Sequence, residues 1–429
     1  MASHSILLVL VIVLGMLSAC VSSGLTTQPT GPELPSNKRL GSVYNDDGAG
    51  ILEALPAGDT TPDDYRKAIN GLLDSQMGVL AICMGLPDPV WYTSNVATTV
   101  DKHWRKHYKT RRADCVEALR AAGTDCLDLA IEVCRSRGVP FVPSYRMNAE
   151  DHAAHQLDLY DFGIAHKDLR IPDTNCLDPT FPEVFEHRMA IFREVATERD
   201  IDGIEFDFRR WWHMVSDPHK NHVVLTRMVR ETRKMLDEVA KKKGRKRLLL
   251  GVRVGPSIDT PTTKQLYPGI GGVYANPSCK DLGLDVRTWI NEELVDYVCP
   301  TLFWPRWPGL PLTREFADLA KGTSVGIYPT LWPIPDWMKE AEPIEPQHTK
   351  WLLRYKNEFC QMALKIYDEG ADGVSTFNWT PYHRPEILRH PGRANWGIGA
   401  KLVQEELCRR LGSPESIRQY LEQPSALSQ

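Results

Sequence analysis

Eight short runs of β-branched and apolar residues alternate with helix-length amphipathic segments along most of this 429-residue chain. Such alternation is typical of parallel strands joined by crossover helices. No glycine-rich dinucleotide loop follows the first run, which favours a closed barrel over an open doubly wound sheet. The sequence therefore predicts an α/β fold, a (β/α)8 TIM barrel, with strands at residues 40–44, 78–84, 139–145, 203–208, 248–254, 295–303, 324–328 and 373–377.

The segments between these strands carry helix boundary signals. Thr61 followed by Pro62 predicts a capped helix start, and residues 178–183 open another helix. Gly138 and Gly370 each stand between a polar helix end and the next strand, as a helix C-cap requires. We expect the barrel domain to span residues 39–392, and residues 393–429 to hold one more helix, at 400–411, and a weakly structured end.

The chain begins with an apolar run that is too short for a comfortable membrane span, as in a signal peptide. The run ends in Leu17-Ser18-Ala19-Cys20, which resembles a bacterial lipobox whose cysteine takes the lipid. Residues 1–20 are thus predicted to be a signal peptide, and the Ser-, Thr-, Gly- and Pro-rich residues 21–38 a flexible tether. Because no Lys or Arg precedes the apolar run, plain secretion is the alternative to a lipid anchor.

Composition excludes several classes of function. The formal net charge of -4 provides no strong field to recruit nucleic acid. Beyond Cys20, the cysteines have irregular spacing and form no CxxC or Cys/His pattern. His213, His219 and His222 have no acidic partners at metal-ligand spacing. The sequence predicts no metal, no cofactor and no nucleic-acid partner, and leaves the oligomeric state open.

The strongest candidate for catalysis is the fourth predicted strand. Active sites of such barrels lie at the carboxyl ends of the strands. Glu205 and Asp207 point to the same side of that strand, about 6.6 Å apart along it. Two carboxylates at such a distance raise each other's proton affinity, so one can stay protonated while the other ionises, as glycoside hydrolysis needs. We expect Asp207 to be the general acid/base and Glu205 its charge partner; a buried ion network with Arg253 or Arg146 is the alternative for Glu205.

Aromatic and charged residues crowd the other predicted strand ends. Flat aromatic rings can stack on the apolar faces of sugars. Guanidinium groups match the oxygens of carboxylates and sulfates, although the same arginines could instead hold the local acids in ion pairs. Asp46 and Asp47 are second candidates for catalysis. The predicted substrate-binding residues are Asp46, Asp47, Tyr145, Arg146, Arg209, Trp211, Arg253, Trp304, Tyr328, Asn378 and Trp379.

Two motifs resemble known glycoside hydrolases. Residues 202–208 are similar to the fourth-strand motif of the chitinase-like family 18 and of the glycosyl-hydrolase-like 10 barrels, and Asp207 matches an acid in both patterns. Residues 373–379 are similar to the Trp-ending eighth strand of such enzymes. Arg209 stands where family 18 has its proton-donating Glu. The resemblance implies the superfamily and names no substrate.

Together these features predict a lipid-anchored glycoside hydrolase of the bacterial cell envelope. Its expected substrate is a polysaccharide or oligosaccharide, with an acidic or sulfated one indicated by the arginines. A non-catalytic carbohydrate-binding barrel is the alternative, since Arg209 replaces an acid. A lyase or sugar-modifying enzyme is a third reading of the same residues.

Overall fold

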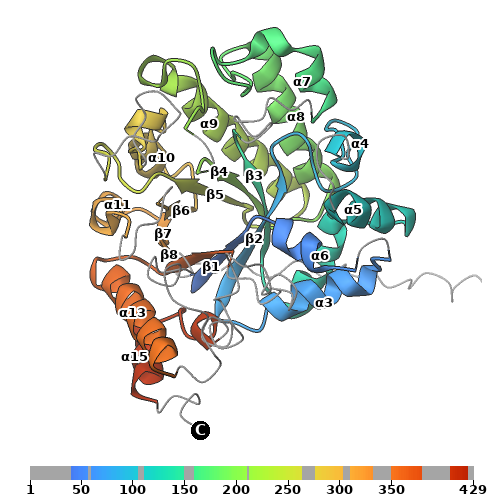
Figure 1. The fold of residues 1–429 in the computed structure, drawn as a ribbon. Helices are drawn as coiled ribbons and strands as arrows, with labels where there is room; N and C mark the ends of the chain where they lie inside the picture. The colour runs from blue at the N-terminus through green and yellow to red at the C-terminus, as the bar shows by residue number, and fades with distance from the viewer. Residues whose placement is uncertain are drawn as a thin grey trace, which may run out of the picture.

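The computed structural model describes residues 40–56, 59–104, 111–148, 159–209, 212–262, 276–302, 310–331, 349–378 and 406–423. Its strands gather at the centre and its helices surround them (Figure 1). The sheet order is β7-β6-β5-β4-β3-β2-β1-β9-β8, and the pairings between these strands are parallel. The strands are β1 Ser42–Asp46, β2 Met77–Gly85, β3 Phe141–Arg146, β4 Gly203–Asp207, β5 Leu249–Val254, β6 Tyr297–Pro300, β7 Gly326–Ile327, β8 Thr330–Leu331 and β9 Val374–Phe377.

The sheet closes through a single segment that contains both β7 and β8. Pro329 divides this segment, because proline has no N–H to donate to a ladder. The first part pairs with β6 and the second with β9. Asp372 N–H also donates to the Ile327 carbonyl at 3.0 Å. Since one segment bonds to both neighbours, the predicted (β/α)8 barrel is confirmed, with its seventh strand split in two.

The helices form the outer wall, and two of their predicted boundaries are confirmed. Thr61 and Asp64 form a capping box at the start of α3, with Pro62 in the first turn. Gly138 ends α6 with φ 68°, the left-handed conformation that favours glycine. The helices are α2 Ala49–Ala54, α3 Pro62–Leu72, α4 Asp101–Trp104, α5 Arg111–Ala121, α6 Cys126–Arg137, α7 Asp161–Ala165, α8 Pro182–Glu198, α9 Pro218–Lys242, α10 Val286–Asn291, α11 Thr313–Leu319, α13 Thr349–Asp368 and α15 Pro414–Glu422, with 3-10 turns η1 Lys167–Leu169 and η2 Lys280–Leu282.

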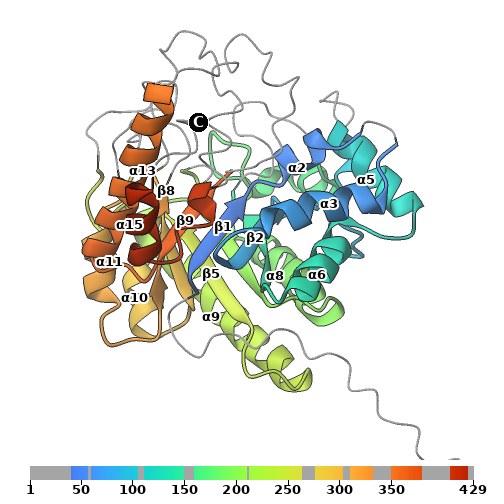
Figure 2. The same cartoon turned by 90° about the horizontal axis from the view of Figure 1, so that it is seen from below.

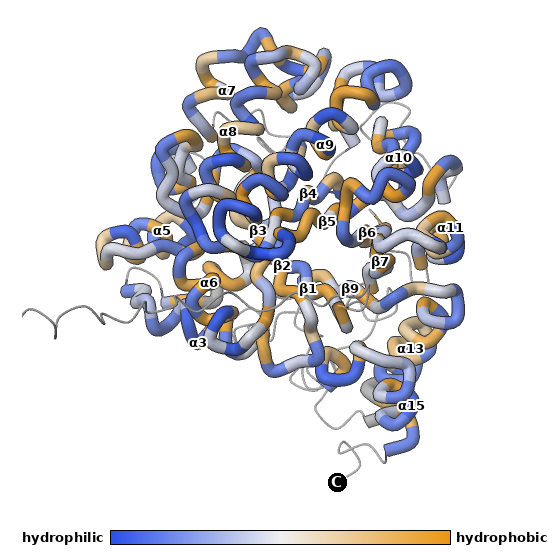
Figure 3. The backbone as a smooth tube through the Cα atoms, turned by 180° about the vertical axis from the view of Figure 1, so that it is seen from behind, coloured by the Kyte–Doolittle hydropathy of each residue, from blue (hydrophilic) through white to orange (hydrophobic). Residues whose placement is uncertain are grey.

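Two apolar layers hold the barrel together. The larger lies between the strands and the outer helices. Figure 3 shows hydrophobic backbone concentrated at the strands, with hydrophilic stretches on the outer helices. The second layer fills the lumen towards its amino-terminal end and consists of Leu40, Val43, Val79, Val142, Leu249, Tyr297, Cys299 and Tyr328. Polar residues farther along the same strands therefore lie above an apolar plug.

The C-terminal part differs from the prediction. Where a weakly structured end was expected, Ser413 caps α15, and this helix lies against α13 (Figure 2). Lys356 joins the two, because its Nζ donates to the Gln423 carbonyl at 3.2 Å and lies 4.1 Å from the centre of the Tyr420 ring. The sequence missed α15 because its buried face depends on α13.

The described residues contain no helix that is both long and apolar enough to cross a membrane. The predicted signal peptide, Cys20 and the tether lie outside the described residues. The nine cysteines from Cys83 to Cys408 are free thiols, and all but Cys408 are buried.

Candidate active site

A buried polar layer lies directly above the apolar plug. Asn45 from β1 donates through Nδ2 to both carboxylate oxygens of Glu205, at 2.7 and 2.9 Å. The Tyr297 hydroxyl donates to Glu205 Oε2 at 3.0 Å, and Ser375 donates to Asn45 Oδ1 at 2.8 Å. A side chain at Gly251 would collide with the Tyr297 ring, since an added Cβ would lie 2.0 Å from Cζ. Gly251 thus gives Tyr297 the space to reach Glu205.

Asp207 lies one layer higher, at the carboxyl end of β4. Its Oδ2 accepts a hydrogen bond from Arg253 Nη1 at 2.9 Å, and its Oδ1 accepts one from the Arg209 backbone N–H, also at 2.9 Å. Asp207 is 3% exposed and Arg253 is 1% exposed. The ion pair joins the ends of β4 and β5, the neighbours in register at Asp207 and Arg253.

A second carboxylate approaches from β1. Asp47 Oδ2 accepts from Asn378 Nδ2 at 2.9 Å, and the Asp47 N–H donates to Asn378 Oδ1 at 2.9 Å. Arg146 Nη2 lies 3.5 Å from Asp47 Oδ2. Asn378 takes a left-handed φ of 54°, a conformation that asparagine tolerates better than most residues. This end of the barrel, here called the mouth, comprises Asp47, Arg146, Asp207, Arg209, Arg253, Phe377 and Asn378.

Phe377, at the end of β9, brings two guanidinium groups together. Arg253 Cζ lies 3.9 Å from the centre of the Phe377 ring, and Arg209 Cζ lies 5.4 Å from it. A cation over an aromatic face is attracted to the ring electrostatically. Arg209 is held further by the bond from its Nε to the Leu302 carbonyl at 3.1 Å. The guanidinium groups of Arg253 and Arg209 are therefore held in place by their neighbours.

The two carboxylates of β4 lie in different electrostatic environments. Burial raises the pKa of Glu205; Arg253 opposes this rise, and the charge of Asp207 adds to it. Asp207 instead accepts hydrogen bonds from the Arg253 guanidinium and from the Arg209 backbone N–H. The sequence left an ion network with Arg253 or Arg146 as the alternative role for Glu205. The ion pair with Arg253 is made by Asp207 instead. Glu205 is bonded to the amide of Asn45 and the hydroxyl of Tyr297.

Three of the predicted site residues are not brought to the mouth. Asp46 follows Asn45 on β1, so its side chain points to the opposite face of the strand. It accepts a hydrogen bond from the Gly48 N–H at 2.8 Å, at the start of α2. The Tyr145 hydroxyl bonds to that of Tyr92 at 2.7 Å, and the Tyr145 ring packs against Phe192 of α8. Tyr328 belongs to the apolar plug, where its hydroxyl accepts from the Leu40 N–H at 2.7 Å.

The structure brings together the remaining described candidates: Asp47, Arg146, Glu205, Asp207, Arg209, Arg253 and Asn378. Trp211, Trp304 and Trp379 lie outside the described residues. Sequence reasoning missed Asn45, Tyr297 and Phe377. Asn45 could have been found by extending the alternation that starts at Val43, because β1 runs to Asp46 and not to residue 44. The reach of Tyr297 depends on Gly251 of another strand, which no local pattern reveals.

Comparison with known proteins gives a partial match. Glycosyl hydrolase DigH from Escherichia coli K12 is 24% identical over 244 residues, which cover 51% of this chain and 51% of DigH. DigH from Shigella flexneri matches to the same extent. The chain thus spans about half the length of the curated relatives that it matches. No family model matches the chain.

Among solved structures, α-L-fucosidase isoenzyme 2 from Paenibacillus thiaminolyticus is 12% identical, has a TM-score of 0.42, and is matched over 85% of this chain and 48% of its own. A family GH18 chitinase from Cycas revoluta is 10% identical, with a TM-score of 0.41, over 83% of this chain and 99% of its own. Neither likeness bears on activity.

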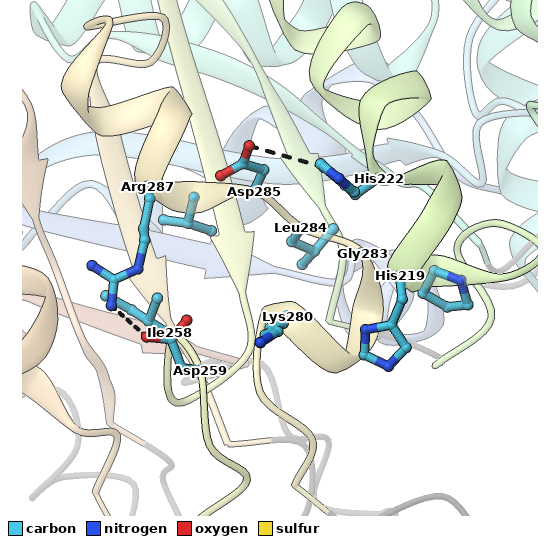
Figure 4. A pocket seen from close by; sticks show the side chains of 11 residues that line it. His219, His222, Ile258, Asp259, Lys280, Gly283, Leu284, Asp285 and Arg287 are labelled. Carbon is cyan, nitrogen blue, oxygen red and sulfur yellow. Dashed lines mark hydrogen bonds and ion pairs between the residues drawn. The ribbon is translucent and has the colours of Figure 1, made fainter.

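A separate cavity of about 250 Å³ lies beside the start of α9, next to η2 and α10 (Figure 4). His219, His222 and Lys280 contribute to its lining. Its wall also holds an ion pair between Arg287 and Asp259, and His222 Nδ1 lies 3.9 Å from Asp285 Oδ2. Within the described part of the chain, no three His, Cys, Asp or Glu side chains form a group that could hold a metal ion.

Proposed function

We propose that this chain is a glycoside hydrolase that cleaves a polysaccharide at the mouth of its barrel. The observation that carries the proposal is the Asp207 carboxylate, held at the carboxyl end of β4 by Arg253 and the Arg209 N–H. The partial likeness to DigH, described as a glycosyl hydrolase, supports the same reaction class. The arginines of the mouth favour a substrate that carries negative charge.

In the proposed mechanism Asp207 is the acid/base carboxylate. Glycosidic cleavage passes through a transition state with positive charge on the sugar ring, which an ionised carboxylate stabilises. Hydrogen bonds from Arg253 and from the Arg209 N–H hold the Asp207 carboxylate in place for this role. Asp47 is the second carboxylate of the mouth, and its side chain is 23% exposed, against 4% for that of Asp207. Asp47 is thus better placed to exchange a proton with solvent.

Glu205 acts through its neighbours in this proposal. It is fully buried, and its carboxylate accepts hydrogen bonds from Asn45 and Tyr297. We therefore assign it a positioning role. Any negative charge on Glu205 repels the Asp207 carboxylate, which lies one layer higher in the lumen. Its removal is expected to shift the pH profile of turnover more than it lowers the maximal rate.

A polysaccharide panel tests the proposal against its closest competitor, a non-catalytic carbohydrate-binding barrel. Arg209 at the family 18 proton-donor position is the observation that favours the competitor. The purified protein is incubated with neutral, uronic-acid and sulfated polysaccharides, and released reducing ends and unsaturated products are measured. A hydrolase releases reducing ends, whereas a binder retains affinity and releases none. Unsaturated product alone would instead identify a lyase.

We also propose export with a lipid anchor at Cys20, because the residues before it have the pattern of a signal peptide and lipobox. Cys20→Ser is expected to abolish labelling with palmitate and to release the protein into the soluble fraction. Unchanged labelling in the membrane fraction contradicts the anchor. Loss of label with the protein still exported supports it.

A further inference from the structure

One guanidinium at the mouth has more donors than partners. Arg253 is 1% exposed and bonds to Asp207 through Nη1 only. Its Nε and Nη2 are buried and have no hydrogen-bond partner among the described residues. Leaving buried donors of a charged group unsatisfied is costly, and native proteins rarely do so without a reason.

Another buried arginine satisfies more of its donors. Arg233, near the amino-terminal end of β5, bonds through Nη1 to Asp296 and through Nη2 to Asp237 and the Leu248 carbonyl. Among the residues that the structure describes, only its Nε is left without a partner. Arg253 leaves two donors open, and Nε with Nη2 forms one edge of the guanidinium plane. That edge presents two parallel N–H groups at the spacing of two oxygens of a carboxylate or sulfate.

The orientation of this edge is fixed by two contacts. The Arg253 guanidinium lies 3.9 Å from the centre of the Phe377 ring, and Asp207 holds the opposite nitrogen at 2.9 Å. A donor pair held in place before binding loses little conformational entropy when a ligand arrives. Phe377 also carries the Arg209 guanidinium at 5.4 Å, so a second positive charge lies close to the same edge.

The charge balance of the mouth favours an anion over a neutral acceptor. Its described residues include the guanidiniums of Arg146, Arg209 and Arg253, against the carboxylates of Asp47 and Asp207. Burial raises the pKa of Glu205 beneath them, which reduces its contribution of negative charge. Excess positive charge in a buried place is stabilised by an anionic group more than by a hydroxyl or amide oxygen.

We infer that the Nε–Nη2 edge of Arg253 is the subsite for an oxyanion on the substrate, so that the enzyme recognises an acidic sugar. The group bound is a carboxylate of a uronic acid or a sulfate ester, which share this two-oxygen chemistry. The inference rests on the proposed function for the position of the sugar chain, and it adds the substituent that the site selects.

The test compares matched oligosaccharides. Oligouronides, their carboxyl-reduced counterparts and sulfated versions of the reduced chains are offered to the wild-type protein, and binding is measured by calorimetry beside release of reducing ends. An oligouronide or a sulfated chain is expected to bind about 10- to 100-fold more tightly than the reduced chain. The better of the two acidic probes identifies the source of the oxyanion.

Arg253→Lys keeps the positive charge beside Asp207 but removes the paired N–H edge. The ratio of the affinities for acidic and reduced chains is therefore expected to fall towards one. Arg245→Lys, at the opposite end of the barrel, is the matched control and leaves the preference unchanged. If Arg253→Lys does not fold, Phe377→Leu, which frees the guanidinium to turn, is expected to weaken the preference.

Equal binding of acidic and reduced probes by the wild type overturns the inference, because water then satisfies Arg253; so does failure of every acidic probe to bind. The two proposals fail separately. Equal turnover of acidic and reduced chains preserves the hydrolase and removes the subsite. A binding preference without released reducing ends preserves the subsite and removes the hydrolase.

Discussion

The two ends of the barrel both bury arginines and aspartates, but they use them differently. At the amino-terminal end, Asp296 accepts from the Leu250 N–H at 2.7 Å and from Arg233 Nη1 at 2.9 Å. Asp202 accepts from the Phe141 N–H at 2.8 Å and pairs with Arg245. Each of these carboxylates satisfies a backbone donor at the start of a strand and an arginine from outside the sheet.

At the mouth, the same residue types leave donors open. Arg253 has two N–H groups without a partner among the described residues, and Asp207 receives from Arg253 and from the N–H of Arg209, which follows its own strand. The difference between the two ends is one of degree: among the described residues Arg233 lacks a partner for Nε alone, whereas Arg253 lacks partners for both Nε and Nη2.

The largest expected effect on stability comes from the amino-terminal end. Asp296→Ala leaves Arg233, whose side chain is 7% exposed, without its principal carboxylate. Removing one partner of a buried ion pair costs about 3–5 kcal/mol. We expect denaturant unfolding to show a loss of that order, with turnover per folded molecule unchanged.

Asp237→Ala is the matched control, because Asp237 pairs with the same Arg233 from a side chain that is 51% exposed. Exposed pairs contribute about 0–1 kcal/mol, so the loss should be small. Equal losses for Asp296→Ala and Asp237→Ala would show that burial of the pair does not matter at this end.

A smaller effect is expected from Glu205→Gln, and it depends on pH. The pKa of Glu205 is raised from its ordinary value of 4.5, so the folded protein binds this proton more tightly than the unfolded chain. The stability gained is fully present below the unfolded pKa and is lost as pH rises through the folded pKa. Between the two pKa values, wild type should lose about 1.4 kcal/mol per pH unit that Glu205→Gln does not lose.

The measurement for Glu205 is urea unfolding of both proteins from pH 4 to pH 8. Asp46, whose pKa burial also raises, titrates in both proteins and therefore cancels in the comparison. Parallel stability curves over the whole range would contradict the assignment of a buried, proton-retaining carboxyl at the base of the mouth.

The smallest effect is expected from Thr61→Ala, which removes the exposed capping box of α3. Losing an N-cap side chain costs about 1 kcal/mol. Turnover should be unchanged, since the contacts of Thr61 lie within the first turn of α3 and none reaches the mouth residues. Thermal unfolding and initial rates check the two statements, and a fall in rate without a fall in stability would count against them.

Much of the fold follows from local sequence. Residue alternation predicts each strand within a few positions, and Thr61 and Gly138 mark helix ends because capping is a local interaction. The split at Pro329 was not predicted, since it depends on which neighbours each half meets. Helix α15 was missed because it is stabilised by packing against α13.

The candidate site was predictable where one strand sets the geometry. Glu205 and Asp207 share a face of β4, and the structure places them in successive layers of the lumen. The partners that define their chemistry come from other strands: Asn45 from β1 and Tyr297 from β6. Because β1 runs to Asp46 rather than to residue 44, the alternation that starts at Val43 places Asn45 in the lumen. Sequence alone therefore predicted the acids better than their environments.

The most direct test measures turnover for two isosteric changes at opposite ends of the barrel. Asp207→Asn removes the carboxylate of the mouth, and Asp202→Asn removes the one that pairs with Arg245 at the amino-terminal end. If the mouth is the active site, Asp207→Asn lowers kcat by about 10²-fold or more while substrate binding survives, because an acid/base group supplies that much. Asp202→Asn should lower stability and leave kcat per folded molecule intact. A folded Asp207→Asn protein with wild-type kcat would contradict the assignment and move attention to Asp47.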